Sequence, residues 1–233
     1  MSTDSVGGLC TLPPRLITSY EKHIDGYNRR PSWKDLREDE LWSELCFCIL
    51  SSNVPYEMAA SALLQLSQKG FLDTDAFTER CARAIAEELS RPIYHPERRD
   101  GSLRVYRFPR RRAHDLVGAW RYIYKQNAGL TQLLQERSSP PDLRLVLVSG
   151  VPGIGFKEAS HFLRDVKYTD SIAVLDSHII SFMNLFVRPP PGHHSMTPRW
   201  YVRLETLFVG LARDLDLCPA ILDMAIWEYM KQV

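Results

Sequence analysis

Two residues whose side chains can take part in covalent chemistry lie at the expected starts of neighbouring helices. Lys157 stands in SGVPGIGFKEASHFLRD, residues 149–165, and Asp176 follows 19 residues later in SIAVLDSHIISF. A lysine amine can bind phosphate, attack carbon as a nucleophile, or remain an ordinary solvated side chain. An aspartate before a helical run is a typical N-cap, and exposed helix amides keep such a carboxylate ionised. The pair therefore admits amine chemistry assisted by a carboxylate, beside a purely structural interpretation.

The glycine-rich turn before Lys157 does not match the common phosphate loops. In the G-x-x-x-x-G-K-[ST] pattern counted from Gly150, Gly155 takes the second glycine position, but Phe156 follows it and no Ser or Thr comes after the lysine. The dinucleotide-binding fingerprint also fails, because Glu158 stands where its third glycine belongs. Neither a nucleotide triphosphatase nor a dinucleotide enzyme is indicated.

A different pattern, h-x-x-h-x-G-h-G-x-x-x-A-x-x-h-h with h apolar, is filled at every position. Its residues are Val148, Val151, Gly153, Ile154, Gly155, Ala159, Phe162 and Leu163. This is the helix-hairpin-helix pattern, in which glycines let the backbone approach a phosphate and the following helix amides attract the anion. It predicts binding to a nucleic-acid backbone without sequence readout, at Gly153 and Gly155 above all.

The charge distribution adds a second candidate nucleic-acid contact. The 233 residues carry a net charge of only +1, which does not by itself suggest such a partner. Seven arginines nevertheless fall within the 20 residues of HPERRDGSLRVYRFPRRRAH: Arg98, Arg99, Arg104, Arg107, Arg110, Arg111 and Arg112. Such clusters commonly meet phosphate, although a solvated arginine-rich loop explains them equally well.

The cysteines and the apolar runs exclude several other classes. The five cysteines, Cys10, Cys46, Cys48, Cys81 and Cys218, form no disulfide framework and no C-x-x-C pair, and H-E-x-x-H is absent. A structural zinc site is therefore not expected, and a reducing, intracellular compartment fits. The N-terminus has no signal-peptide pattern, and no apolar run approaches the length of a membrane span.

Helical periodicity dominates the chain, so an all-α fold is predicted. Apolar spacings of three and four predict helices over residues 38–52, 56–70, 73–89, 110–126, 177–186, 199–215 and 220–232. The runs RLVLV and SIAVL fit short buried strands as well as helix, but no alternating hairpin pattern supports a sheet. Trp33, Trp42 and Trp120 are expected in the core.

With these residues in place, the segment GIGFKEASHFLRD…IAVLDSHII resembles the helix-hairpin-helix DNA glycosylases that carry a Gly/Pro-rich loop and a catalytic Asp. It resembles most narrowly the type 2 branch of the 8-oxoguanine DNA glycosylase/lyases. ELCFCILSSNVPYEMA, YRFPRRRA and LDMAIWEY are similar to further elements of that family, so the resemblance spans about 33–229. It implies one catalytic unit of two helical subdomains with a DNA-binding cleft between them: about 33–70 with 200–233 and the termini, and about 71–199 with the hairpin at 146–165.

The resemblance also implies a chemistry. Lys157 would attack C1′ of the damaged nucleotide, the base would leave, and β-elimination from the Schiff base would cut the strand, while Asp176 would stabilise charge on the sugar. An ordinary lysine is less than roughly 0.1% deprotonated at pH 7, so its surroundings must favour the free amine. The target base must leave the stack.

DNA contacts are expected from Asn53 as a polar wedge, and from His178, Arg110, Arg112 and the hairpin glycines. Asn53 is otherwise a helix-ending turn residue, and His178 an ordinary first-turn residue. The family's hairpin binds Na⁺ or K⁺ through backbone carbonyls, here those of Ser149, Val151 and Ile154. The iron–sulfur cluster of a related branch is not expected, because only Cys218 lies near the C-terminus.

The chain departs from the resemblance at its end. Type 2 members usually finish on a lysine that reaches the damaged base, whereas this chain ends WEYMKQV, with Val233 last. Lys231, Trp227 and Asp223 are the candidates for the base pocket, although Trp227 also suits the core. A non-catalytic damage-binding module and a glycosylase for another base stay open as alternatives. We expect a monomer that acts on double-stranded DNA containing 8-oxoguanine, in cytoplasm, nucleoid or nucleus.

Overall fold

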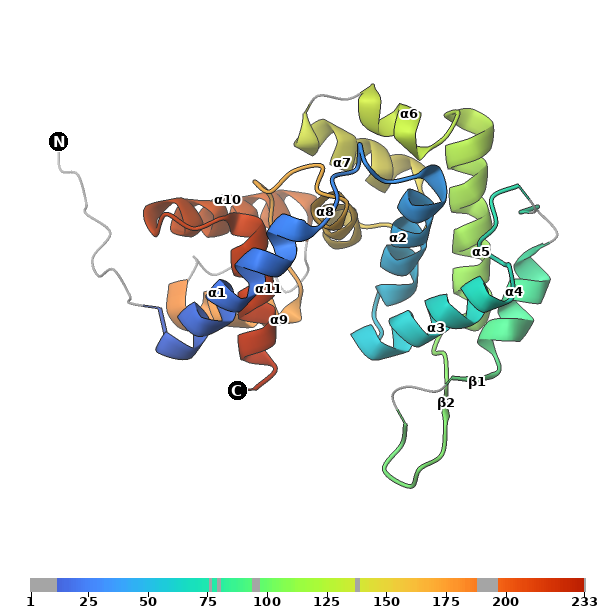
Figure 1. Ribbon diagram of the computed structural model, residues 1–233, viewed down its shortest axis with the longest axis horizontal. Coiled ribbons are helices and arrows are strands. Elements are labelled where there is room, and N and C mark those ends of the chain that lie inside the picture. Colours follow the sequence, from blue (N-terminus) through green and yellow to red (C-terminus); the bar gives the residue numbers. More distant parts are fainter. Residues whose placement is uncertain are drawn as a thin grey trace. The chain divides into compact units, whose positions relative to one another are not determined.

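A computed structural model describes residues 12–75, 77–78, 81–93, 97–136, 139–187 and 197–232. These residues are overwhelmingly helical, so the predicted all-α class is confirmed (Figure 1). The elements in chain order are α1 (Pro14–Arg29), α2 (Glu38–Ser51), α3 (Tyr56–Gln68), α4 (Cys81–Leu89), β1 (Pro92–Ile93), β2 (Arg104–Val105), α5 (Pro109–Trp120), the π-helical segment η1 (Arg121–Gln126), α6 (Leu130–Gln135), α7 (Pro140–Gly150), α8 (Phe156–Asp165), α9 (Ser177–Phe182), the π-helical segment η2 (Met183–Val187), α10 (Pro198–Asp214) and α11 (Pro219–Met230).

Several elements differ from the sequence prediction. The helix expected over residues 73–89 is helical only from Cys81, and α1 and α6 were not anticipated. The run RLVLV lies within α7. SIAVL begins with a bend at Ser171 and Ile172 and belongs to no helix or strand. In the arginine-rich segment, Pro92 pairs with Val105 and Ile93 with Arg104 in a two-residue antiparallel ladder that the periodicity did not reveal.

The chain divides into two compact units. The terminal unit comprises the described residues of 1–30 and 173–233, and the central unit comprises those of 31–172. This division differs from the predicted one, which grouped residues 33–70 with 200–233. The physical reason is that α2 packs against α3, α5, α6 and α8, so it belongs to the core that holds the hairpin. No described helix is long and apolar enough to cross a membrane.

The central unit is built around α2. Glu40 accepts a hydrogen bond from Arg37 N at 2.8 Å, which caps the start of the helix, and three acidic residues in its first turn favour the positive end of the helix dipole. Beyond that turn α2 is almost wholly buried. Trp42 lies edge-on to Phe77, and Trp120 stacks on the same ring. Trp42 and Trp120 are buried, and Trp33 packs against this core, as predicted.

The terminal unit joins the two ends of the chain. Helix α1 lies along α11 (Figure 1). Glu228 of α11 accepts from Ser19 Oγ at 2.9 Å and pairs with Lys22 Nζ at 2.6 Å. Buried Tyr27 packs beside Ala220 and Ile221. Helix α1 is thus held mainly by residues about 200 positions away in the chain. This explains why local sequence patterns did not predict the helix.

Candidate active site

The hairpin before Lys157 has the geometry that its glycines predict. Helix α7 ends at Gly150, and α8 begins at Phe156 after a tight turn. Gly153 has a φ of +81°, a conformation that side chains rarely adopt. A Cβ there would also lie 2.9 Å from the side chain of Asp115 in α5. Glycine is therefore required at this position, both for the turn and for its close approach to α5.

Lys157 lies in the first turn of α8, immediately after the hairpin. Its side chain keeps 28% of its surface exposed, and its Nζ lies 3.9 Å from Glu158 Oε1, a loose ion pair. The other carboxylate oxygen of Glu158 accepts from Gly155 N at 3.2 Å, so Glu158 is tied to the helix start. The Lys157 side chain is thus partly buried, and its amine is only weakly held.

Asp176 is the N-cap of α9, as predicted. Its Oδ1 accepts hydrogen bonds from His178 N at 2.9 Å and Ile179 N at 3.0 Å. Both bonds use the same oxygen, and Oδ2 accepts no hydrogen bond from the residues that the structure describes. Asp176 belongs to the terminal unit, whereas Lys157 belongs to the central unit.

The backbone before Asp176 belongs to no helix or strand, and side chains supply its hydrogen-bond partners. Ala173 N donates to Glu205 at 3.2 Å, and Val174 N donates to Asp223 at 2.9 Å. Tyr201 Oη donates to the carbonyl of Ala173 at 2.9 Å and accepts from Leu175 N at 3.2 Å. Buried backbone groups require partners, and α10 and α11 supply them. Asp176 therefore stands at the end of a tightly fixed segment.

Asn53 lies in the turn after α2, exposed and with a φ of +60°. Asparagine tolerates this left-handed conformation better than most residues. The turn is fastened from the arginine-rich segment: Arg107 Nη1 donates to Asn53 O at 3.3 Å, and Tyr106 Oη donates to Leu50 O at 2.6 Å. Two hydrogen bonds from the arginine-rich segment thus hold the backbone of the turn that carries Asn53.

Arg112 lies elsewhere than predicted. Its side chain is 2% exposed, its Nη2 donates to Ser52 O at 2.9 Å, and its Nη1 pairs with Asp115 Oδ2 at 2.7 Å. A buried guanidinium that holds the end of α2 is not available to a DNA phosphate. The predicted DNA contact at Arg112 is therefore corrected to a structural role, which arises because α5 places this position against α2.

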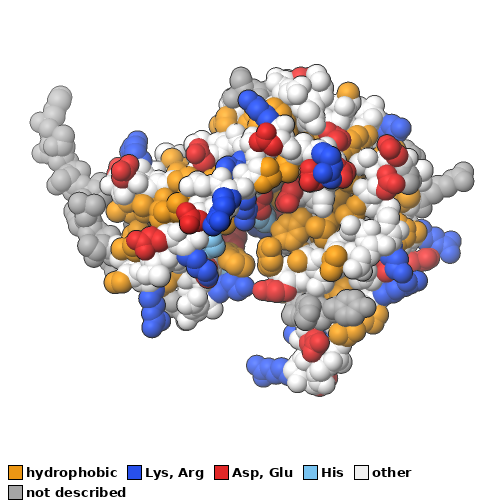
Figure 2. Space-filling model, viewed as in Figure 1, with side chains coloured by type: hydrophobic (Ala, Val, Ile, Leu, Met, Phe, Trp, Pro, Cys, Tyr) orange, Lys and Arg blue, Asp and Glu red, His pale blue; other side chains and the backbone are white. Residues whose placement is uncertain are grey.

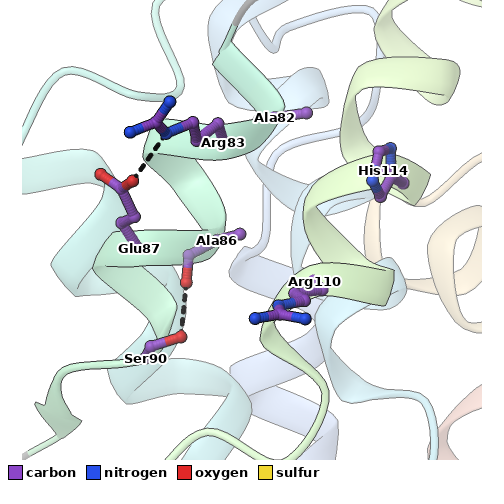
Figure 3. A pocket seen from close by; sticks show the side chains of 7 residues that line it. All are labelled: Ala82, Arg83, Ala86, Glu87, Ser90, Arg110 and His114. Carbon is purple, nitrogen blue, oxygen red and sulfur yellow. Dashed lines mark hydrogen bonds and ion pairs between the residues drawn. The ribbon is translucent and has the colours of Figure 1, made fainter.

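Arg110 differs from Arg112 in being exposed. Together with His114 of the same helix and Arg83 of α4 it lines an open groove between α4 and α5 (Figure 3). Arg83 Nε donates a hydrogen bond to Glu87 at 2.9 Å. Figure 3 marks no hydrogen bond or ion pair between Arg110 and the other residues that line the groove. Charged side chains of both signs are interspersed over the face in Figure 2, in keeping with the small net charge. Arg110 thus stays a candidate for a phosphate contact.

The predicted base-pocket residues separate into two groups. The Trp227 ring lies edge-on to His178, with centroids 6.2 Å apart, and Lys231 Nζ lies 4.2 Å from the Trp227 ring centroid. Asp223, in contrast, is 1% exposed and bonded to Val174. Its predicted place in a base pocket is corrected to fixing the backbone before Asp176.

Sequence reasoning missed three residues that shape these sites: Asp115, Glu205 and Tyr201. Asp115 packs against Gly153, and the other two hold the backbone at 173–175. Each of them contacts a residue at least 26 positions away, so its role could not be predicted from local sequence spacing.

The chain resembles known proteins over most of its length. The sequence model of the family described as 8-oxoguanine DNA glycosylase matches residues 20–217. An 8-oxoguanine DNA glycosylase/AP lyase from Picrophilus torridus is 31% identical over 205 residues, which cover 86% of this chain and 85% of that protein. The protein of the same name from Methanocaldococcus jannaschii is 29% identical over 198 residues, 84% of this chain and 83% of that one.

The fold is also found among solved structures. The crystal structure of the Methanocaldococcus jannaschii 8-oxoguanine glycosylase/lyase, in complex with a 15mer DNA containing 8-oxoguanine, aligns with a TM-score of 0.71 at 24% identity. The alignment covers 94% of this chain and 98% of that chain. From the family match across residues 20–217 and the relative that is 31% identical, it follows that this chain belongs to the 8-oxoguanine DNA glycosylase family.

Proposed function

We propose that the protein excises 8-oxoguanine from DNA and then cuts the abasic strand by β-elimination. The observation that carries the proposal is the weakly held amine of Lys157 directly after the hairpin, in a chain of this family. Nζ forms a bond to C1′ while the glycosidic bond breaks and the base leaves. The sugar opens to a Schiff base, loss of a 2′ proton expels the 3′ phosphate, and water then frees the lysine.

In this proposal Asp176 stabilises the positive charge that develops on the sugar. Its Oδ1 is committed to the α9 amides, and Oδ2 is left for the substrate. Because the preceding backbone is fixed by Glu205, Tyr201 and Asp223, the carboxylate is preorganised, which is the condition under which a fixed charge contributes most to catalysis.

The hairpin is the proposed backbone-binding element. The turn at Gly153 and Gly155 lets a phosphate approach the amides that start α8. The carbonyls of Ser149, Val151 and Ile154 are hard oxygen donors of the kind that Na⁺ or K⁺ accepts. The Val151 carbonyl, which accepts a long 3.3 Å bond from Ile154 N, keeps a second lone pair for such an ion. These residues therefore fit a monovalent cation, which would add positive charge beside the DNA.

We keep the predicted DNA contacts of those residues whose side chains are exposed or half-buried. Asn53 would fill the gap left by the flipped nucleotide, and Arg110 and His178 would meet phosphates. Trp227 offers an aromatic face and edge for the displaced base, with Lys231 over the ring. We propose that one chain acts alone on double-stranded DNA, since it supplies the amine, the carboxylate and the wedge.

The test uses a duplex with a single 8-oxoguanine and a matched duplex with guanine. Each reaction is analysed with and without alkali, which separates base excision from strand cutting. The proposal predicts that the 8-oxoguanine strand is cut without alkali, that Lys157→Gln abolishes this cutting, and that Asp176→Asn slows excision. Duplex binding without any cutting would instead indicate a non-catalytic damage-binding module, and excision of a different base would overturn the substrate assignment.

A further inference from the structure

The turn that carries Asn53 is fastened by side chains of one short segment, residues 106–112. Three carbonyls at the end of α2 accept hydrogen bonds from it: Leu50 O from Tyr106 Oη at 2.6 Å, Ser52 O from Arg112 Nη2 at 2.9 Å, and Asn53 O from Arg107 Nη1 at 3.3 Å. The last carbonyls of a helix lack partners within it, so these side chains act as its cap. Asn53 itself has a φ of +60°, a conformation that persists where the surroundings fix it. The 106–112 segment therefore determines where the turn presents Asn53.

Arg112 also reaches the element that supports the hairpin, the second turn proposed to contact DNA. Its Nη1 pairs with Asp115 Oδ2 at 2.7 Å, about one helical turn further along α5. The same Oδ2 lies 2.9 Å from the position that a Cβ of Gly153 would take, so the hairpin turn rests directly on this carboxylate. A Cβ on Gly118 would lie 2.8 Å from Pro152 Cγ. The hairpin turn is therefore seated on α5 at two points, and one of them is bonded to Arg112.

A buried guanidinium is an unfavourable way to cap a single carbonyl. Arg112 is almost wholly buried, and its Nε has no hydrogen-bond partner among the residues that the structure describes. A buried ion pair adds little net stability compared with well-packed apolar side chains, because desolvation offsets the attraction of the charges. The planar guanidinium instead provides geometry, since two of its nitrogens bind two elements at once. These elements are the end of α2 and the part of α5 under the hairpin.

We propose that Arg112 is a positioning residue for base flipping, and that Arg112 and Asp115 form a brace that fixes the Asn53 turn relative to the hairpin turn. This inference rests on the proposed function, in which the hairpin holds the DNA backbone and Asn53 fills the gap left by the flipped nucleotide. Both turns must then reach the same stretch of duplex together. The brace keeps them in that arrangement before DNA binds, so that backbone binding and insertion of the wedge require no rearrangement.

The positioning role predicts a loss of activity that depends on the substrate. Excision of a paired base requires that base to leave the stack, whereas a preformed abasic site has no base to displace. A misplaced wedge therefore slows the excision of 8-oxoguanine and has little effect on cutting at an abasic site. A protein that is merely destabilised would lose both activities by the same factor, because the folded fraction limits both.

Two variants remove the brace in different ways. Arg112→Lys keeps a positive charge beside Asp115 but loses the second guanidinium nitrogen, which reaches Ser52 O. Arg112→Met combined with Asp115→Asn leaves no buried charge unpaired, so it keeps the test decisive if the lysine variant folds poorly. Glu88→Gln is the matched control, because it alters a buried carboxylate of the same unit whose ion-pair partner, Arg91 at 2.8 Å, belongs to neither turn.

The measurements are single-turnover rates on a duplex with one 8-oxoguanine and on the same duplex with a preformed abasic site, with thermal unfolding of every sample. A 2-aminopurine beside the lesion reports flipping directly, because its fluorescence rises when its neighbour leaves the stack. Both brace variants should excise 8-oxoguanine at least about tenfold more slowly and cut the abasic site within about twofold of the unaltered rate. They should also lose most of the fluorescence rise. Glu88→Gln should change both rates by one common factor.

Equal losses of the brace variants on the two substrates, or no loss on either, would overturn the positioning role of Arg112. Failure of the proposed function gives a different result. If the unaltered protein neither excises 8-oxoguanine nor cuts the abasic site, the proposed reaction is wrong, and a fluorescence rise that depends on Arg112 would still support the brace. If the unaltered protein gives no fluorescence rise, or Asn53→Ala leaves the rise unchanged, the wedge and the brace are both overturned.

Discussion

Asp223 Oδ2 accepts a hydrogen bond from Val174 N at 2.9 Å, and so ties α11 to the backbone two residues before Asp176. The carboxylate is almost wholly buried. Its energetic role is to satisfy an amide that would otherwise be left unpaired in the interior. The bond therefore links the stability of the terminal unit to the placement of its proposed functional carboxylate.

Asp223→Ala should lower both stability and excision. It removes the partner of a buried amide, a change that costs about 1–3 kcal/mol of unfolding free energy. It also loosens the segment that ends at Asp176. The measurements are the urea midpoint and the single-turnover excision rate, with Asp223→Asn as the matched variant that keeps an acceptor oxygen. Equal stability of the alanine variant and the unaltered protein would contradict this account.

Gly153→Ala should weaken DNA binding and stability together. The positive φ disfavours alanine by roughly 1–2 kcal/mol, and the added Cβ would press on the Asp115 side chain. Gly26→Ala in α1 is the control, because nothing lies within 4 Å of a Cβ there. That change should be neutral or stabilising by up to about 1 kcal/mol. Duplex affinity and thermal unfolding are measured for both, and similar effects of the two substitutions would count against the hairpin geometry.

Substitution of Arg112 should affect stability, whereas substitution of Arg110 should affect DNA binding. Arg112→Met leaves Asp115 without its partner and should destabilise the central unit by roughly 3 kcal/mol. Arg110→Ala should leave stability almost unchanged, lower duplex affinity, and reduce the slope of log affinity against log salt by about 1. Chemical unfolding and salt-dependent binding give the two readouts. An unchanged salt slope for Arg110→Ala would exclude its proposed phosphate contact.

Alkaline pH should destabilise the central unit through Tyr106. Burial raises the pKa of Tyr106 to about 12, whereas an unfolded tyrosine titrates near 10. A raised folded pKa gives stability that is complete below pH 10 and is lost as the pH rises toward 12, by about 2–3 kcal/mol at most. Tyr106→Phe should lack this part of the pH dependence. Urea midpoints at pH 8 and pH 11 for both proteins test it, and equal losses in both would refute it.

Local features of the sequence predicted the parts of the site that depend on local geometry. The hairpin pattern located the turn at Gly153, and the position of Asp176 before a helical run identified its N-cap role. Both follow from contacts within a few residues. The structural roles of Arg112 and Asp223 could not be predicted from local sequence. Their hydrogen-bond partners, Ser52 and Val174, lie 60 and 49 residues away.

The fold shows the same distinction. Strong periodicity located α2, α10 and α11 closely. Helix α1 has no capping side chain and depends on packing against α11, so it left no local signal. The run SIAVL was ambiguous because a short apolar run fits a buried strand as well as a helix. The side chains that satisfy its amides come from α10 and α11, far away in the chain.

The central claim is that Lys157 is the amine that attacks the damaged nucleotide. The most direct measurement is borohydride trapping of the protein on a duplex with one 8-oxoguanine, followed by identification of the modified residue by mass spectrometry. Lys69→Gln, which changes an exposed lysine at the end of α3, serves as the control. The account predicts an adduct on Lys157 that persists in Lys69→Gln and disappears in Lys157→Gln; an adduct of undiminished yield in Lys157→Gln would contradict it.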